Sequence, residues 1–258
     1  MSGTLFMVAT PIGNLEDITL RAVRVLREVD AVACEDTRVT GKLLAHLEIK
    51  KPLVSVHEHS GSAVIERVIE RLKAGESIAY ASDAGTPGVN DPGGKLVEAA
   101  FAAGITVVPI PGPSAVTAAI SACGCAMDDF RYVGFIPHKK GRETLLKTIA
   151  ADLVPTIFFE STHRIEKTLE ALAKYLDPKR LVFCGRELTK MHETIYRGTI
   201  EEVRAALQKT STKGEFVIIV LGLTRLDEER GGCEERSKPY SPYGVEHRRI
   251  QRSYSPNV

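Results

Sequence analysis

The stretch SIAYASDAGTPGVNDPGG, residues 77–94, joins a short apolar run to a loop with four glycines, two prolines and two aspartates. Glycine has no Cβ, so the main chain of this loop can come close to a bound molecule. The apolar run has the length of a buried strand. Open α/β sheets bind ligands at the carboxyl ends of their strands, where this loop begins. The stretch therefore predicts an α/β fold with a ligand at residues 82–94.

The first 110 residues alternate apolar runs with segments of helical periodicity. The other runs lie at residues 5–10, 31–34, 53–57 and 105–110. Between two of them, Val64, Val68 and Leu72 recur on one helical face, and Gly75 follows where that helix should end. Alternating strands and helices predict a mainly parallel sheet covered by helices. We expect this N-terminal α/β domain to span residues 1–113.

Three turns after these runs are unusual in composition: ATPIGN (9–14), SDAGTPGVNDPGG (82–94) and PGPSA (111–115). Parallel strands place their carboxyl ends at one edge of a sheet, so all three turns can face one crevice. The alternative is that they are only tight turns, which Gly, Pro, Asn and Asp form in many proteins. Their occurrence at three equivalent strand ends favours a shared ligand site.

The pattern changes after residue 113. Strands are expected at 130–137, 155–161, 180–188, 192–199 and 214–223, and helices at 141–151, 164–176 and 200–209. Several of these strands follow one another directly, which predicts a mixed sheet in a second α/β domain over residues 114–225. Residues 226–258 have mixed charge and no apolar periodicity, so we expect a disordered tail.

Composition and missing motifs exclude several classes of protein. The 34 basic and 33 acidic residues give a net charge of +1, unlike a protein coated for non-specific nucleic-acid binding. The glycine motifs of nicotinamide and nucleotide-triphosphate sites are absent, as is that of serine hydrolases. The five cysteines and the pair His57 and His59 lack metal-site spacing, so we expect no metal. No apolar run approaches the roughly 20 residues that span a bilayer, and we expect a cytoplasmic protein.

The three turns suit a ligand bound through main-chain contacts and apolar walls, with little phosphate. Strand-end carbonyls and an aspartate favour a cationic group and ribose hydroxyls. S-adenosylmethionine combines a sulfonium, a ribose and an adenine, so we expect it as the cofactor.

Eight short motifs, in this order, carry a resemblance to a known family: VATPIGNLEDITLRA, EDTRVTGKLL, SDAGTPGVNDPG, VPIPGPSA, GFIP, FESTHR, RELTK and KGEFVIIV. The chain closely resembles the tetrapyrrole methylase family, and within it the branch that methylates ribosomal RNA. The resemblance implies two α/β domains with S-adenosylmethionine in the cleft between them. It also implies methylation of a cytidine ribose 2′-hydroxyl in the decoding region of 16S rRNA, by a homodimer acting on the small ribosomal subunit.

The sequence departs from the family pattern in two places. ATPIGN replaces the G-x-G-P-G-D that is common after the first strand, which fits the rRNA branch and argues against a porphyrin substrate. Ser60 and Gly61 stand where Asn-Glu is expected after His59, which puts any substrate contact of that Asn in doubt.

The resemblance also assigns cofactor contacts to both domains. In the first domain and at the boundary they are Pro11, Asp83, Ala84, Gly85, Thr86, Val89, Ser114 and Ala115. In the second domain they are Phe159, Glu160, Ser161, Leu188 and Thr189.

A ribose hydroxyl is a poor nucleophile, so a general base should assist its methylation. The candidate bases are Glu35, Asp36 and Asp91, although Asp36 could instead cap a helix and Asp91 could form a turn. Candidates for RNA phosphate contacts are Arg38, Arg164, Arg186 and Lys190, each of which could instead be an ordinary surface charge.

Two other functions stay open. One is a family enzyme that methylates a porphyrin precursor or a protein side chain. The other is an RNA-binding protein that holds the cofactor without turning it over.

Overall fold

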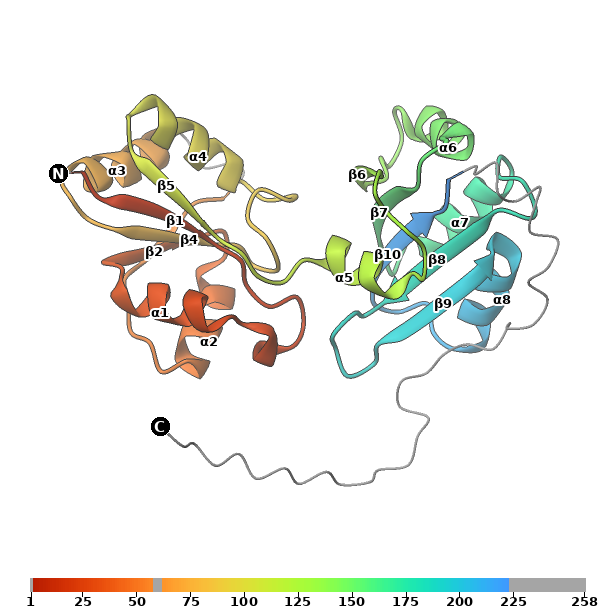
Figure 1. Ribbon diagram of the computed structural model, residues 1–258, viewed down its shortest axis with the longest axis horizontal. Helices are drawn as coiled ribbons and strands as arrows, with labels where there is room; N and C mark the ends of the chain where they lie inside the picture. Colours follow the sequence, from red (N-terminus) through yellow and green to blue (C-terminus); the bar gives the residue numbers. More distant parts are fainter. Residues whose placement is uncertain (1, 58–61, 223–258) are drawn as a thin grey trace, which may run out of the picture.

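The computed structural model describes residues 2–57 and 62–222, which form two α/β domains side by side (Figure 1). The predicted fold class is confirmed: the first sheet is parallel and the second is mixed. The expected tail at 226–258 and His59 lie outside the described residues. Within 2–57 and 62–222, no helix has the length and apolar character needed to cross a membrane.

The first domain contains a five-stranded sheet in the order β3-β2-β4-β1-β5, and every neighbouring pair is parallel. Its strands are β1 (Thr4–Val8), β2 (Ala31–Cys34), β3 (Leu53–Ser55), β4 (Ile78–Ala81) and β5 (Thr106–Ile110). The strands β2 and β4 are buried along their whole length, as apolar strands covered on both faces should be. This order places the carboxyl ends of β2, β4, β1 and β5 side by side.

Helices cover both faces of this sheet (Figure 1). The elements are η1 (Leu15–Asp17), α1 (Leu20–Glu28), α2 (Thr37–His46), α3 (Ser62–Lys73) and α4 (Gly93–Ala102). Successive side chains of a strand point to opposite faces, so Leu5 packs in the apolar cluster with α3 and α4, whereas Val8 packs in the one with α1 and α2. The helix α1 begins after Thr19, whose hydroxyl accepts a hydrogen bond from the Ala22 amide.

The second domain contains a mixed sheet in the order β6-β7-β10-β8-β9. Only the β6–β7 pair is parallel among the described strands of this sheet. The strands are β6 (Arg131–Phe135), β7 (Thr156–Ser161), β8 (Leu181–Arg186), β9 (Thr194–Thr199) and β10 (Glu215–Val220). One face packs on α6 (Arg142–Ala151), α7 (Ile165–Ala173) and α8 (Ile200–Lys209), and the other packs on α5 (Ala115–Ala122).

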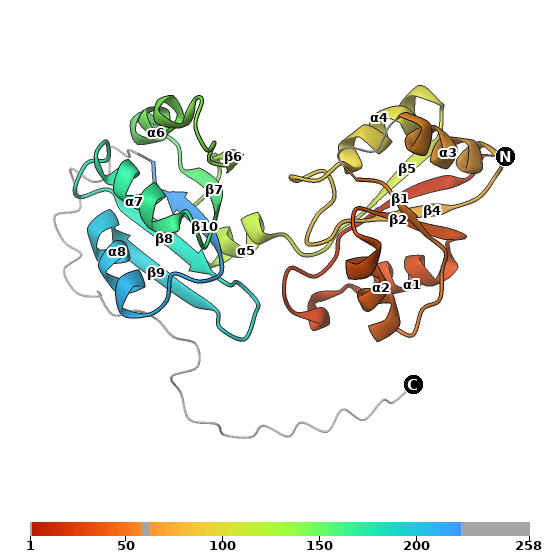
Figure 2. The same cartoon turned by 180° about the vertical axis from the view of Figure 1, so that it is seen from behind.

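The described chain crosses between the domains once, through residues 111–115 and α5 (Figures 1 and 2). Turns of the first domain also touch the second. Ile12 packs against the apolar cluster that contains Val116 and Leu188. The side-chain amide of Asn90 donates a hydrogen bond of 2.6 Å to the hydroxyl of Tyr132 on β6. The strand-end turns of the first domain therefore lie against the second domain.

Candidate functional site

Main-chain hydrogen bonds join the turns after β1 and β4. Thr10 and Gly85 exchange both of their main-chain hydrogen bonds, each 3.0 Å long, as an isolated antiparallel bridge. Gly85 has φ +82°, a conformation that favours glycine. On the other side of the first turn, the Ala9 amide donates to the Ile110 carbonyl at the end of β5. The turns therefore form one continuous surface, as the parallel sheet predicts.

The turn after β5 joins the same surface. The Thr86 hydroxyl donates a 3.0 Å hydrogen bond to the Pro113 carbonyl. A Cβ on Gly112 would lie 3.0 Å from the Cβ of Ala9, so the two turns meet closely there. The predicted cofactor residues of the first domain and boundary lie along this surface: Pro11, Asp83, Ala84, Gly85, Thr86, Val89, Ser114 and Ala115. Their contacts with a cofactor stay a prediction.

The ends of β2 and β4 each bring one aspartate to this edge, Asp36 and Asp83. The Asp83 carboxylate accepts a 3.1 Å hydrogen bond from the Asp36 amide, and partial burial raises the pKa of Asp83 above its usual value. Asp36 caps α2 through the Arg38 amide and forms a 2.6 Å ion pair with the Arg38 guanidinium. These contacts with Arg38 lower the pKa of Asp36 to about 2. Asp36 therefore caps a helix, as the structural alternative for this residue predicts.

Asp91 braces the loop that contains it. Its carboxylate accepts hydrogen bonds from the main-chain amides of Gly88, at 2.9 and 3.0 Å, and of Gly93, at 2.7 Å. The Tyr80 hydroxyl donates a longer bond of 3.4 Å. A carboxylate with these partners fixes the turn before α4, so the contacts favour the turn-forming alternative for Asp91 over a role as base.

Thr189 is the most unusual residue of the second-domain loop. Its φ is +67°, which is rare for a β-branched side chain, and its buried hydroxyl has no hydrogen-bond partner among the described residues. A Cβ on Gly13 would lie 3.0 Å from the Thr189 hydroxyl and 2.4 Å from Cγ of Lys190. The first turn of one domain and the predicted cofactor loop of the other are therefore in direct contact.

Such a strained residue with an orphaned polar atom is typical of a ligand site. The site fits a cofactor with polar groups, because the Thr189 hydroxyl lacks a partner that such a ligand would supply.

The strand β7 separates its predicted cofactor residues onto two faces. Phe159 packs on the face with α5, which is the face nearer the first domain. The Glu160 side chain lies on the opposite face, where it is buried, accepts a 2.7 Å hydrogen bond from the Thr168 hydroxyl and pairs with Arg164 at 3.1 Å. Only the main chain of Glu160 is therefore available to a ligand between the domains.

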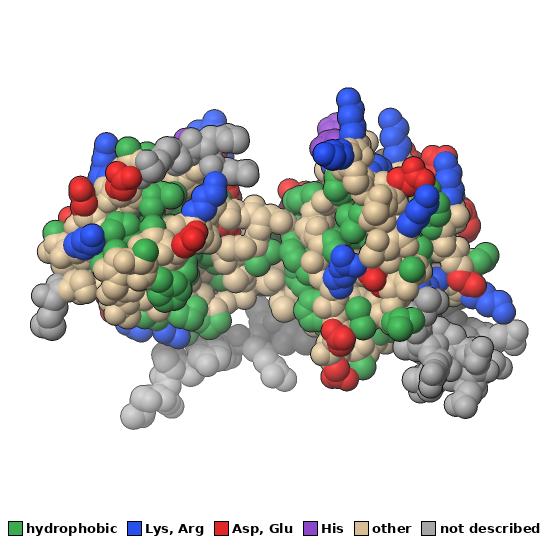
Figure 3. All heavy atoms as spheres, turned by 90° about the horizontal axis from the view of Figure 1, so that it is seen from above, with side chains coloured by type: hydrophobic (Ala, Val, Ile, Leu, Met, Phe, Trp, Pro, Cys, Tyr) green, Lys and Arg blue, Asp and Glu red, His purple; other side chains and the backbone are tan. Residues whose placement is uncertain are grey.

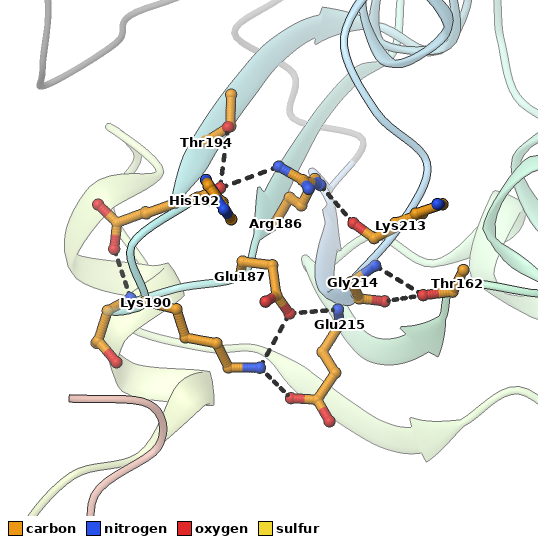
Figure 4. Close-up of polar contacts among 11 residues, drawn as sticks. Thr162, Arg186, Glu187, Lys190, His192, Thr194, Lys213, Gly214 and Glu215 are labelled. Atoms are coloured by element: carbon orange, nitrogen blue, oxygen red, sulfur yellow. Dashed lines mark hydrogen bonds and ion pairs between the residues drawn. The ribbon is translucent and has the colours of Figure 1, made fainter. Parts of the chain in front are cut away.

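The four predicted RNA contacts differ in accessibility. Arg38 is 84% exposed next to the turn surface. Arg164 is half-buried and pairs with Glu160, and Arg186 donates to the main-chain carbonyls of Lys213 and His192 (Figure 4). Lys190 pairs with Glu187 and Glu215, each at 2.9 Å (Figure 4). These contacts favour structural roles for Arg164, Arg186 and Lys190 and leave Arg38 as the accessible candidate.

Two open grooves lie elsewhere on the surface. One of about 760 Å³ lies between α2 and β3, and one of about 660 Å³ is lined by residues 186–194 and 210–214. Neither contains a residue of the three turns. Among residues 2–57 and 62–222, no three His, Cys, Asp or Glu side chains gather as a metal site would require.

Sequence reasoning missed three contacts at the domain junction, those of Gly13, Asn90 and Tyr132. Asn90 has φ +60°, and its place before Asp-Pro was a signal, because Asn tolerates the left-handed region in turns. For Gly13 the signal was its residue type, because a glycine in the ATPIGN turn allows another part of the chain to come close. The partner Tyr132 had none, since its contact depends on how the two domains meet.

Comparison with known proteins shows which family this chain is similar to. The sequence profile of the Tetrapyrrole (Corrin/Porphyrin) Methylases matches residues 4–204. A relative from Synechocystis sp. named Ribosomal RNA small subunit methyltransferase I is 44% identical over 226 residues, which cover 87% of this chain and 81% of the relative. A relative of the same name from Halalkalibacterium halodurans is 46% identical over 221 residues, covering 85% and 76%.

Solved structures share the fold. Uroporphyrin-III-C-methyltransferase from Thermus thermophilus superposes with a TM-score of 0.60 at 22% identity, covering 84% of this chain and 94% of that one. Diphthine synthase superposes with a TM-score of 0.69 at 17% identity, covering 86% and 91%. At these identities the likeness shows the two-domain fold alone.

Proposed function

The chain belongs to the tetrapyrrole methylase family, and from that premise we propose that it is an S-adenosylmethionine-dependent methyltransferase of ribosomal RNA. Its target in this proposal is the ribose 2′-hydroxyl of a cytidine in the decoding region of 16S rRNA. The observation that carries the proposal is the identity of 44–46% with proteins named Ribosomal RNA small subunit methyltransferase I, over 85–87% of this chain.

The turn surface and the Thr189 loop are the parts of the chain that would hold the cofactor. S-adenosylmethionine, when bound, supplies a methyl group already activated on a sulfonium. The main chain of residues 84–86 is open to close approach because Gly85 has no side chain. The Thr189 hydroxyl offers a buried polar contact, and Phe159 offers an apolar wall. Positioning of the two reactants by such groups can contribute up to roughly 7–11 kcal/mol to catalysis.

The carboxylates at this edge are unequal as proton acceptors. Asp36 is a weak base because its pKa is about 2, and the oxygens of Asp91 are engaged by main-chain amides. Glu35, the third predicted base, directly follows β2 at the same edge. Asp83, which accepts a hydrogen bond from the Asp36 amide, has a raised pKa, and its charge would also favour a cationic ligand. In this proposal Glu35 accepts the proton or a hydrogen bond from the ribose hydroxyl.

The substrate is proposed to be the assembled small subunit, and the acting species a homodimer. A 2′-hydroxyl target restricts the reaction to RNA, since DNA lacks this group. In this proposal the exposed guanidinium of Arg38, at the start of α2, contacts a phosphate of the bound strand.

A methyl-transfer assay with labelled S-adenosylmethionine tests the proposal, with small ribosomal subunits, free 16S rRNA and a porphyrin precursor offered in parallel. The expected result is label in the rRNA of the subunit, at one cytidine whose 3′ linkage becomes resistant to alkali. Label in the porphyrin precursor alone would refute the RNA substrate. Cofactor binding without label in any acceptor would refute catalysis and leave a cofactor-holding RNA-binding protein.

A further inference from the structure

An aromatic cluster occupies the edge of the second sheet that faces the first domain. Phe135, the last residue of the edge strand β6, is 52% exposed. Its ring meets that of Phe159 edge-to-face at 5.6 Å, and Phe159 meets Tyr132 in the same way at 5.3 Å. The Phe135 ring therefore packs against Phe159 on one side, while much of its surface is exposed to solvent.

This cluster is fixed to the loop that follows β4. Tyr132 accepts the 2.6 Å hydrogen bond from Asn90. Asn90 and Gly134 both have left-handed backbone conformations, and a Cβ on Gly134 would lie 3.0 Å from Oδ1 of Asn90. The close fit places Phe135 beside the turn surface that is proposed to hold the reacting groups.

Three basic side chains follow Phe135 on the loop to α6. His138, Lys139 and Lys140 are all exposed. Among the described residues, no acidic side chain forms an ion pair with either lysine. Figure 3 looks down on this part of the second domain and shows Lys, Arg and His side chains projecting from it.

Two half-buried arginines, Arg142 and Arg164, hold this loop through hydrogen bonds. Arg164 donates to the Ile136 carbonyl, and Arg142 donates to the carbonyl of Pro137 and to the Thr168 hydroxyl. Gly141, with φ +80°, then turns the chain into α6. The contacts of Arg164, predicted from sequence as a phosphate contact, favour a structural role: they hold the loop that carries the two exposed lysines.

A fixed aromatic face beside unpaired cations is the combination that binds single-stranded nucleic acid. Bases stack on the ring, and the cations meet the phosphates. We propose that Phe135, Lys139 and Lys140 form a docking surface for single-stranded RNA, with a base next to the target nucleotide stacked on Phe135. This inference rests on the proposed function, since it assigns part of the RNA site of the same enzyme. The lysines favour a polyanion over an apolar protein partner.

Fluorescence anisotropy with a labelled single-stranded RNA of the 16S decoding region tests the inference at several salt concentrations. Phe135→Ala should weaken RNA binding roughly 5- to 150-fold, the range found for one stacked base, and Phe135→Trp should retain it. Lys139→Ala/Lys140→Ala should make the slope of log K against log salt shallower by about 1.4, at roughly 0.7 per phosphate contact.

Matched controls exist elsewhere on the chain. Phe101 on α4 is 67% exposed, and Lys50 and Lys51 are another adjacent pair, beside β3. Phe101→Ala and Lys50→Ala/Lys51→Ala should leave RNA affinity and salt slope unchanged. S-adenosylmethionine affinity should stay at the wild-type value in the Phe135 variants. The stability of Phe135→Ala should fall only by about the value of one aromatic contact, which thermal unfolding measures.

Several outcomes would overturn the inference. Equal RNA affinity in Phe135→Ala and Phe101→Ala would remove the stacking role. Loss of S-adenosylmethionine affinity with RNA binding intact would assign the ring to the cofactor. A change of oligomeric state in sedimentation, with RNA binding intact, would assign it to a protein contact. If the wild-type protein neither binds nor methylates the RNA, the proposed function itself fails, and that result is distinct from a failure of the variants alone.

Discussion

Replacement of Thr189 by glycine should make the ligand-free protein more stable and its cofactor binding weaker. The left-handed conformation of a β-branched residue costs about 1–2 kcal/mol, and the orphaned hydroxyl costs a further 1–3 kcal/mol or so. Glycine loses about 0.5–1 kcal/mol through its greater freedom in the unfolded chain. The net gain should be about 1–4.5 kcal/mol. For a protein of this size each kcal/mol raises Tm by roughly 2–4 °C.

Thermal unfolding and titration calorimetry with S-adenosylmethionine measure the two effects on Thr189→Gly. Loss of the hydroxyl should weaken binding about two- to tenfold, the value of one net hydrogen bond. Thr189→Val separates the causes, because it removes the hydroxyl and keeps the strained backbone.

Glu48 supplies the control for this prediction. It also has positive φ, at 55°, but is exposed at the end of α2. Glu48→Gly should leave cofactor affinity unchanged. A Thr189→Gly protein that is less stable than wild type, or that binds the cofactor equally well, would refute the argument that strain at Thr189 serves the ligand.

Three further predictions follow from the same contacts. Glu35→Gln should lower the rate of methyl transfer by roughly 10²- to 10⁴-fold with cofactor affinity intact, measured by labelled transfer; a variant with the wild-type rate would exclude Glu35 as base. The pKa of Asp36 is depressed to about 2 from 3.8, so its stabilisation of the folded state is present above pH 3.8 and is lost as pH falls through 2. The difference in Tm between wild type and Asp36→Asn should shrink over that window, and a difference at pH 2 as large as that above pH 3.8 would contradict this. Glu160→Ala should lower the free energy of unfolding by about 2–4 kcal/mol, because it removes the carboxylate partner of the half-buried Arg164 and of the buried Thr168 hydroxyl. Urea denaturation measures the loss, and an unchanged midpoint would show that this pair is not holding the fold.

The sequence was sufficient for the two sheets and for the edge at which the turns meet. Apolar runs such as 78–81 are buried on both faces, and this constraint leaves a clear pattern in the residue types. The convergence of residues 9–14, 82–94 and 111–115 then follows from the parallel order of the strands.

The direction of charged side chains could not be predicted in the same way. Arginine is the residue type expected at a phosphate contact, which is why Arg164 and Arg186 were candidates. Arg164 instead pairs with Glu160 and donates to the Ile136 carbonyl, and Arg186 donates to the Lys213 carbonyl. The two carbonyls come from distant parts of the chain. One orientation was open to inference. Neighbours on a strand point to opposite faces, so Phe159 and Glu160 could not both have turned their side chains toward one ligand.

Within residues 2–57 and 62–222 the chain crosses between the domains once, and this has a consequence for how the protein unfolds. Each domain has its own core, and besides residues 111–115 the described contacts between them include those of Ile12, Gly13 and Asn90. A molecule bound by both domains adds its binding free energy only to the state in which both are folded and docked. Ligand binding should therefore convert two separate melting transitions into one cooperative transition. The ligand would then couple the unfolding of the two domains, and a single transition in calorimetry would indicate that both domains bind it.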